Sequence, residues 1–147
     1  MARKGRFVVV DRKEPFTAWF FFRKDSQKAA DALLEELRAK GRMSEKEMSR
    51  FVKKLEAGEL GFRFSKNNFY RKVLRTFIED GFVKKEAVYG GEKGRTVDVY
   101  LPVRQPILTH PPDFPSFWSV TYGVCLWWNE MMFPQDEVDN QQEGHRV

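Results

Sequence analysis

The spacing of apolar residues in this chain changes at Gly81, and the change restricts the folds that the chain can adopt. Between residues 26 and 80, apolar residues recur every three or four positions, which is the period of helices that bury one face. After Gly81, residues 82–89 and 95–103 are rich in β-branched and aromatic types, and apolar residues alternate along the second segment. The pattern predicts an α+β protein, and 147 residues are enough for one domain with its own core.

The first two predicted helices have start and end signals. The first is expected to begin near Ser26 and to end at Gly41. The second is expected to begin at Ser44, because Ser44 and Glu47 have the spacing of a capping box, and to end near Gly58. Each helix would bury one apolar stripe and expose the rest of its surface.

The third predicted helix, between an N-cap at Ser65 and a stop at Gly81, separates apolar from cationic residues. At about 100° per residue, one half of its surface is apolar and an opposing arc is polar and cationic. The apolar half consists of Phe69, Tyr70, Val73, Leu74, Phe77 and Ile78. The opposing arc consists of Asn68, Arg71, Lys72 and Arg75. Such an arc is either a solvated helix face or a surface that binds an anion.

Residues 82–103 are predicted to form an antiparallel hairpin. The sequence "GGEKGR" between its two strands supplies glycines for a turn and is not followed by a helix, so it is not a phosphate-binding loop. Lys93 and Arg95 would lie at the tip of this hairpin, where they could neutralise phosphates or simply remain in water.

Three helices followed by a hairpin, with the third helix ending in "EDGFVKKE", resemble the winged helix-turn-helix family of DNA-binding domains. The resemblance covers about residues 26–103. It implies that the third helix enters the major groove and that the hairpin, called the wing, contacts the phosphate backbone or the minor groove. One departure is "EAGELGFRF", residues 56–64, because it is longer than the short turn of compact family members and leaves room for a half-turn or short strand.

The side-chain chemistry of the third helix agrees with this resemblance. Arg can bond two acceptors of guanine, Asn can bond two groups of adenine, and Lys acts as a point charge on phosphate. Asn68, Arg71 and Arg75 are therefore predicted to contact bases and Lys72 to contact phosphate. The complete set of predicted DNA-binding residues is Lys66, Asn68, Arg71, Lys72, Arg75, Lys93 and Arg95.

The first 25 residues are expected to form a basic arm and a β-like extension. Arg3, Lys4 and Arg6 could lie along DNA or merely keep the terminus in solution. Residues 7–10 and 17–22 resemble two strands, although the run from Trp19 to Phe22 does not alternate. Either this hairpin is buried on both faces, or part of it leads into the first helix.

The C-terminal part differs in composition from the rest. Residues 104–116 are expected to be a proline-rich connector, and residues 135–147 a disordered acidic tail. Between them, residues 117–134 contain large apolar side chains that must pack somewhere. They can fold back onto the domain, beside residues 16–22, or form a dimer interface, and both can hold. The predicted interface residues are Phe117, Trp118, Trp127, Trp128, Met131, Met132 and Phe133.

Charge and composition favour a nucleic-acid partner over catalysis. Residues 1–103 contain 24 cations and 15 anions, a net charge of +9, whereas residues 104–147 have a net charge of −4. Cys125 is the single cysteine, and neither a catalytic triad nor a metal-ligand cluster is readable. No enzymatic activity, cofactor, metal or membrane association is expected, and the protein is expected in the cytoplasm, associated with the nucleoid.

The expected function is sequence-specific binding of double-stranded DNA, as by a transcriptional regulator; a homodimer is one of the two alternatives left open for the aromatic C-terminal segment. A replication initiator is a variant of the same function. The alternative is a winged-helix module for protein–protein interaction, or an accessory subunit of a replication or transcription machine, that binds its partner through the aromatic C-terminal segment.

Overall fold

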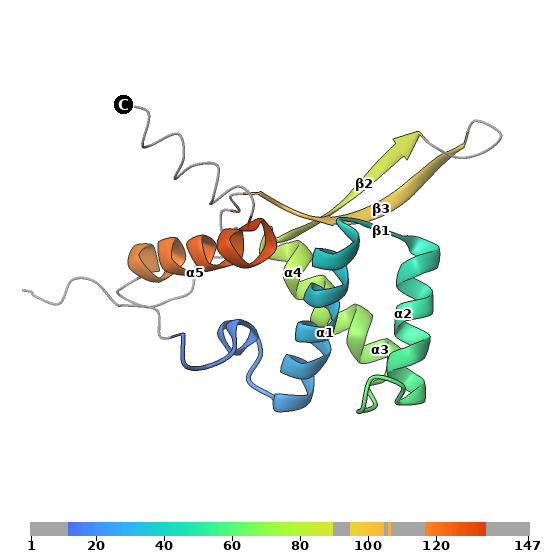
Figure 1. Cartoon of the computed structure of the whole chain (residues 1–147), viewed down its shortest axis with the longest axis horizontal. Helices are drawn as coiled ribbons and strands as arrows, with labels where there is room; N and C mark the ends of the chain where they lie inside the picture. Colours follow the sequence, from blue (N-terminus) through green and yellow to red (C-terminus); the bar gives the residue numbers. More distant parts are fainter. Residues whose placement is uncertain (1–11, 90–94, 105, 107–116, 135–147) are drawn as a thin grey trace, which may run out of the picture.

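The computed structural model describes residues 12–89, 95–104, 106 and 117–134, without the side chains of residues 117–122 (Figure 1). The described chain has an α+β arrangement, with helices around a small antiparallel sheet. Its first elements are the 3-10 helix η1 (Phe16–Trp19), helix α1 (Lys24–Lys40), strand β1 (Met43–Ser44) and helix α2 (Glu45–Ala57). These are followed by α3 (Lys66–Asn68), the π-helical segment η2 (Phe69–Leu74), α4 (Arg75–Glu79), the strands β2 (Val83–Tyr89) and β3 (Thr96–Pro102), and helix α5 (Phe117–Met132).

The capping residues set the bounds of α1 and α2 as the sequence predicted. Helix α1 ends at Gly41, whose φ of 80° suits glycine, and it begins two residues before Ser26. The Ser44 side chain accepts from the Glu47 backbone N–H, and the Glu47 carboxylate accepts from the Ser44 N–H, which completes the predicted capping box. Helix α2 ends at Gly58 in the left-handed conformation.

Segments α3, η2 and α4 follow one another without a break, because the residues at both junctions keep right-handed helical torsions. They form one helix, called helix 66–79 below. The predicted N-cap is confirmed, since the Ser65 side chain accepts from the Asn68 N–H at 3.1 Å. The long connection before it contains no strand. Instead Phe64 is buried and its N–H donates to the Leu55 carbonyl at 3.2 Å, which fastens the connection to α2.

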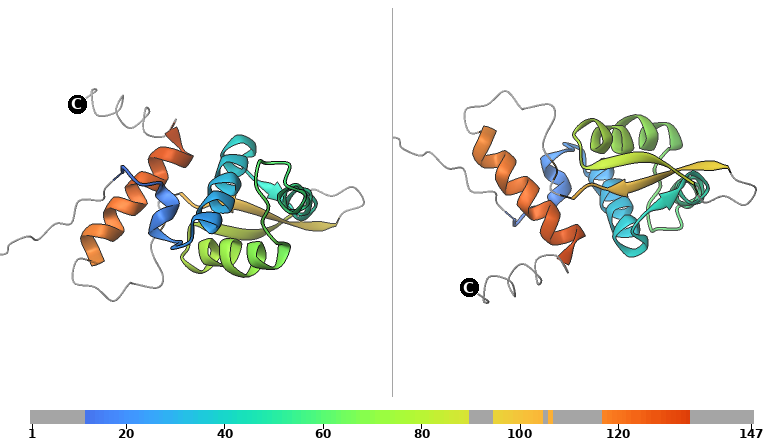
Figure 2. Two further views of the ribbon diagram at one scale, coloured as in Figure 1. Left: turned by 90° about the horizontal axis from the view of Figure 1, so that it is seen from below. Right: turned by 90° about the horizontal axis from the view of Figure 1, so that it is seen from above.

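The predicted hairpin is confirmed, and its strands belong to a three-stranded antiparallel sheet in the order β1-β3-β2. The short strand β1 pairs with β3 through Met43 opposite Tyr100 and Ser44 opposite Val99. The two-residue strand therefore joins the start of α2 to the base of the hairpin, whose other end projects beyond α2 (Figures 1 and 2).

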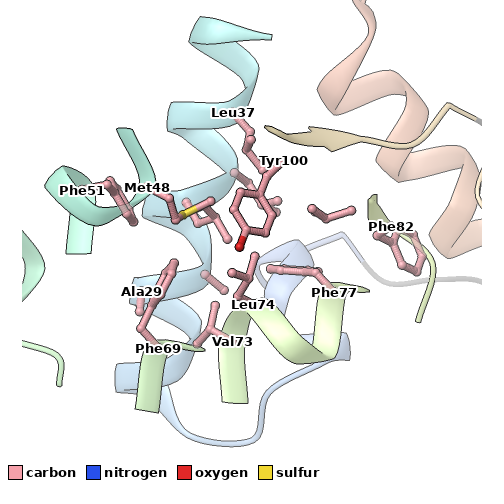
Figure 3. Packing of buried hydrophobic residues seen from close by; sticks show 14 of the residues in the cluster. Ala29, Leu37, Met48, Phe51, Phe69, Val73, Leu74, Phe77, Phe82 and Tyr100 are labelled. Atoms are coloured by element: carbon pink, nitrogen blue, oxygen red, sulfur yellow. The ribbon is translucent and has the colours of Figure 1, made fainter. Parts of the chain in front are cut away.

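One apolar core holds the described elements together. Helix α1 contributes the fully buried Leu33 and Leu37, and Figure 3 shows side chains from α2, helix 66–79 and β3 meeting it. Tyr100 of β3 reaches into this cluster, so the sheet covers part of the helical core. Burial of such side chains contributes roughly 1.5–3 kcal/mol each.

Helix α5 packs into the same core. Trp128 is fully buried, and its ring lies 5.0 Å from Phe82 and 5.9 Å from Phe16 between centroids. Its indole N–H donates to the Val103 carbonyl at 2.7 Å, so the polar group of this buried side chain also has a hydrogen-bond partner. The expectation that residues 117–134 fold back beside residues 16–22 is confirmed for the described side chains.

The strand expected at residues 17–22 is wrong, because Phe16–Trp19 form the 3-10 helix η1. Phe16 and Phe21 are buried on either side of this turn, and the buried Thr17 hydroxyl donates to the Asp31 carboxylate at 2.9 Å. A consecutive aromatic run can be buried by a tight helical turn without strand alternation. The segment leads into α1, which is the second alternative that the sequence left open.

Several predictions fall outside the described residues: the basic arm with Arg3, Lys4 and Arg6, the strand at residues 7–10, most of the proline-rich connector and the acidic tail. Among the residues that are described, each helix is too short or too polar to cross a membrane.

Candidate nucleic-acid interface

Helix 66–79 exposes the polar face that the sequence predicted. Asn68, Arg71, Lys72 and Arg75 are all exposed, and together with Asn67 they line one shallow surface groove. On the opposite side, Phe69, Val73, Leu74 and Phe77 are buried in the core. The packing of the apolar side therefore fixes which side chains this helix presents to a partner.

The π turn explains which apolar residues of helix 66–79 are buried. In a regular helix, at about 100° per residue, Tyr70 would lie on the buried side with Phe77. In the structure Tyr70 is half-buried and Ile78 is 37% exposed. A π turn takes up an extra residue, so that the residues after it lag by about 100°. The predicted apolar half is therefore wrong at Ile78 and only partly right at Tyr70.

The same π turn accounts for the place of Asn67. In a regular helix Asn67 would lie about 90° from the centre of the arc formed by Asn68, Arg71, Lys72 and Arg75. The lag after the π turn moves the later residues toward Asn67, so that all of them border one groove. Sequence reasoning missed Asn67 because it assumed a regular helix, and neither Gly nor Pro marks the π turn.

The cations of this face differ in their pairing. Arg75 forms an ion pair with Glu79 one turn later, at 2.5 Å. Within the described residues, neither Arg71 nor Lys72 pairs with a carboxylate. Arg71 and Lys72 are therefore available to an anionic ligand, whereas Arg75 must share its guanidinium with Glu79 or leave it.

The first turn of helix 66–79 already carries an anion. The Glu56 carboxylate accepts from the Lys66 backbone N–H at 3.1 Å, which satisfies one free donor of the helix start. The Lys66 side chain is exposed at the first position of this helix. A phosphate that approached this end would meet the Lys66 ammonium but would be repelled by Glu56.

The hairpin supplies one described cation near its tip. Arg95 is exposed just before β3, whereas Lys93 lies outside the described residues. At the base of the hairpin, Lys85 pairs with Glu45 of α2 at 3.1 Å, and this hydrogen bond is the main reason that the pKa of Lys85 is raised. The base is therefore fixed to α2 by an ion pair as well as by β1.

The aromatic residues predicted as an interface divide into two groups. Trp128 and Met132 are buried within their own chain, so they are core residues and are not available to a partner. Trp127, Met131 and Phe133 are half-buried and keep part of their surface exposed. The side chains of Phe117 and Trp118 lie outside the described part of the chain.

Cations cover some of this remaining aromatic surface. The Arg12 guanidinium lies 5.3 Å from the Trp127 ring and pairs with Glu130, which ties the start of the described chain to α5. The Arg104 guanidinium lies 4.3 Å from the Phe133 ring. These contacts allow half-exposed aromatic rings to remain on a protein surface.

The described residues contain no group of three or more His, Cys, Asp or Glu side chains that could hold a metal ion. Comparisons with protein-family models, curated proteins and solved structures found no match to this chain. Its function must therefore be inferred from the surfaces that its own fold presents.

Proposed function

We propose that this chain is a winged-helix protein that binds double-stranded DNA, with helix 66–79 in the major groove and the β2–β3 hairpin as the wing. Three helices followed by a hairpin support this fold assignment, since that order of elements carries the family resemblance. The sheet order β1-β3-β2 holds the hairpin next to the start of α2, and Tyr100 of β3 packs in the same core as the buried side of helix 66–79.

The observation that carries the proposal is the groove bordered by Asn67, Asn68, Arg71, Lys72 and Arg75 on an exposed helix face. An α-helix fits the major groove of B-DNA, where Arg can bond guanine O6 and N7 and Asn can bond adenine N6 and N7. A helix face that held only lysines would favour phosphate contact alone. The combination of amides and guanidinium groups favours reading of base edges.

Each side chain then has a defined task. Asn68, Arg71 and Arg75 contact bases, while Lys72 and Lys66 contact the flanking phosphates. Arg95, and Lys93 beyond the described residues, bring cations to the backbone from the hairpin. Because base contacts give sequence preference, we further propose that the protein is a transcriptional regulator with a defined operator.

The proposal is tested by fluorescence anisotropy with random duplex DNA at several salt concentrations. The wild type should bind with a steep salt dependence. Arg71→Ala with Arg75→Ala should bind more weakly and with a shallower salt dependence, because two base-contacting cations are lost from the helix that lies between the phosphate backbones. Lys28→Ala with Arg38→Ala removes the same charge from exposed positions of α1 and should leave the slope unchanged. An absence of binding at low salt, or equal slopes for the two double variants, would refute the proposal.

A second candidate is a winged-helix module that binds another protein, or a second copy of itself, through α5. The half-buried Trp127, Met131 and Phe133 favour it, because aromatic residues and Met are enriched in interfaces. Sedimentation of the wild type over a range of concentrations tests self-association. For a self-associating protein, Trp127→Ala should shift the molecules to monomers without affecting DNA binding, and a wild type that stays monomeric leaves only a foreign partner for this surface.

A further inference from the structure

A second basic surface lies on α2. Lys46, Arg50 and Lys53 are exposed and are spaced four and three residues apart, so they form one stripe on the side opposite the buried Met48 and Leu55. At 1.5 Å per residue, the stripe extends for about 10 Å along the helix. No residue of this stripe borders the groove on helix 66–79, so the stripe is not part of that groove.

The charge of this stripe is not balanced by its neighbours. Among the described residues, none of the three cations pairs with a carboxylate. The carboxylates of α2 are each held elsewhere: Glu45 by Lys85 at 3.1 Å, Glu47 by Lys40 at 3.3 Å, and Glu56 by the Lys66 backbone N–H at 3.1 Å. Glu45 and Glu47 are thus paired with lysines outside the stripe, and Glu56 accepts from a backbone N–H outside it. The three cations of the stripe are exposed without a carboxylate partner among the described residues.

Helix α1 provides an internal comparison. Its solvent side also has three exposed cations, Lys24, Lys28 and Arg38, but Asp31 and Glu35 lie among them. Lys28, Asp31 and Glu35 border the same surface groove, which confirms that they share one side of the helix. Such mixed charge is typical of a helix face that contacts only water. The stripe on α2 differs, because no carboxylate lies between its cations on that side of the helix.

The position of α2 places its basic stripe at the same end of the molecule as the hairpin. Helix α2 lies at the end opposite α5, and the hairpin projects past it at the same end (Figures 1 and 2). Arg95 lies near the tip of that hairpin. The α2 stripe and the hairpin thus present their cations at one end of the molecule, away from the aromatic surface of α5.

We propose that the outer face of α2 is a second DNA-binding surface, which contacts the phosphate backbone of duplex DNA through Lys46, Arg50 and Lys53. The inference rests on the proposed DNA binding and extends it. The stripe has no Asn or Gln, and two of its three cations are lysines, which act as point charges on phosphate, so it supplies mainly affinity and little sequence preference. DNA held by both surfaces must be longer than the site read by helix 66–79, or bent toward α2.

The test compares salt slopes of DNA binding for full-length variants, on duplexes of about one and about three helical turns (about 10 base pairs per turn). The triple change Lys46→Ala, Arg50→Ala and Lys53→Ala should lower the slope on the longer duplex by about 2.7, or about 0.9 per phosphate contact. The effect should be smaller on the shorter duplex, which cannot reach both surfaces. Since Ala favours helix and these side chains are exposed, the variant should keep the wild-type circular dichroism.

The control removes the same three charges from α1 through Lys24→Ala, Lys28→Ala and Arg38→Ala. If the stripe binds DNA, the salt slope of binding should be lower for the α2 variant than for the wild type and unchanged for the α1 variant. Equal losses would show an effect of net charge alone and would overturn the inference, as would an α2 variant with the wild-type slope.

The same experiment separates this inference from the proposed function. If Arg71→Ala with Arg75→Ala lowers the slope and the α2 variant does not, the second surface is refuted and the reading helix stands. If only the α2 variant has a lower salt slope than the wild type, α2 is the DNA-binding surface and the role of helix 66–79 is refuted. If neither variant differs from the wild type, both ideas fail.

Discussion

Replacing Trp128 by Ala should be the most damaging single change in α5. Trp128 is the largest of the fully buried side chains, and its ring contacts Phe16, Phe77 and Phe82. Its indole N–H also donates to the Val103 carbonyl at 2.7 Å. The change would therefore open a cavity where η1, helix 66–79 and α5 meet, and would remove the donor to a carbonyl group.

The size of the effect follows from these contacts. Trp→Ala changes in cores cost about 3–5 kcal/mol, including the cavity that remains. The neighbouring Trp127 is half-buried, packs edge-on against Phe16 at 5.3 Å and lies beneath Arg12, so Trp127→Ala should cost only about 1–2 kcal/mol. Trp128→Phe keeps much of the packing but lacks the donor, and should cost about 1–3 kcal/mol.

Urea denaturation followed by far-ultraviolet circular dichroism measures these differences in the free energy of unfolding. A domain of this size is stable by about 5–15 kcal/mol, so Trp128→Ala should remove a large part of the total, and the loss should fall in the order Trp128→Ala, Trp128→Phe, Trp127→Ala. If Trp128→Ala costs no more than Trp127→Ala, α5 is not part of the core, and the packing argued from Trp128 is wrong.

Three other predictions follow from charged groups. Glu79→Gln releases Arg75 from its ion pair and should raise DNA affinity about two- to fivefold in the anisotropy assay. A weaker complex would contradict the proposed role of Arg75. Hydrogen bonding to the Ser44 backbone lowers the pKa of Glu47, so the charged carboxylate stabilises the fold at neutral pH, and this stabilisation is lost as the pH falls through the lowered pKa. In urea denaturation, Glu47→Ala should therefore lower the free energy of unfolding by about 1 kcal/mol at pH 7 and by little at pH 2–3. Partial burial of the Asp31 carboxyl raises its pKa, which makes the charged form less favourable in the fold at neutral pH. Asp31→Asn should therefore stabilise the protein at pH 7, and the gain should disappear below the ordinary value of 3.8; an equal gain at both pH values would exclude this cause.

Local signals made much of the fold predictable. The capping box at Ser44, the N-cap at Ser65 and the glycines at positions 41 and 58 depend on backbone groups a few residues away, so the sequence shows them directly. The β2–β3 hairpin was predictable for the same reason, since its strands are neighbours in the chain. The exposure of the cations of helix 66–79 was predictable because apolar and polar residues are clearly separated around the helix, even though one turn of it is irregular.

Other elements depend on partners far away in the sequence. Strand β1 has only two residues and exists because Met43 and Ser44 meet β3, more than fifty residues later. Helix α5 is apolar on most of its surface, so its sequence has no amphipathic period from which a helix could be predicted. The turn η1 is a helical way to bury consecutive aromatic residues, which the composition alone would also allow as a strand.

The π turn in helix 66–79 was not predictable from the sequence, and it bears on the proposed function. It comprises Phe69–Leu74 and so includes Arg71 and Lys72, and its buried residues keep the helix fixed to the core. A π turn costs regular hydrogen bonding, and such turns are found frequently at functional sites. Without it, Asn67 would lie about 90° from the centre of the arc formed by Asn68, Arg71, Lys72 and Arg75, at the edge of the polar face. The irregular turn is thus a local departure from good helix geometry that adds Asn67 to the polar face, and such a departure is expected if this face is the proposed binding surface.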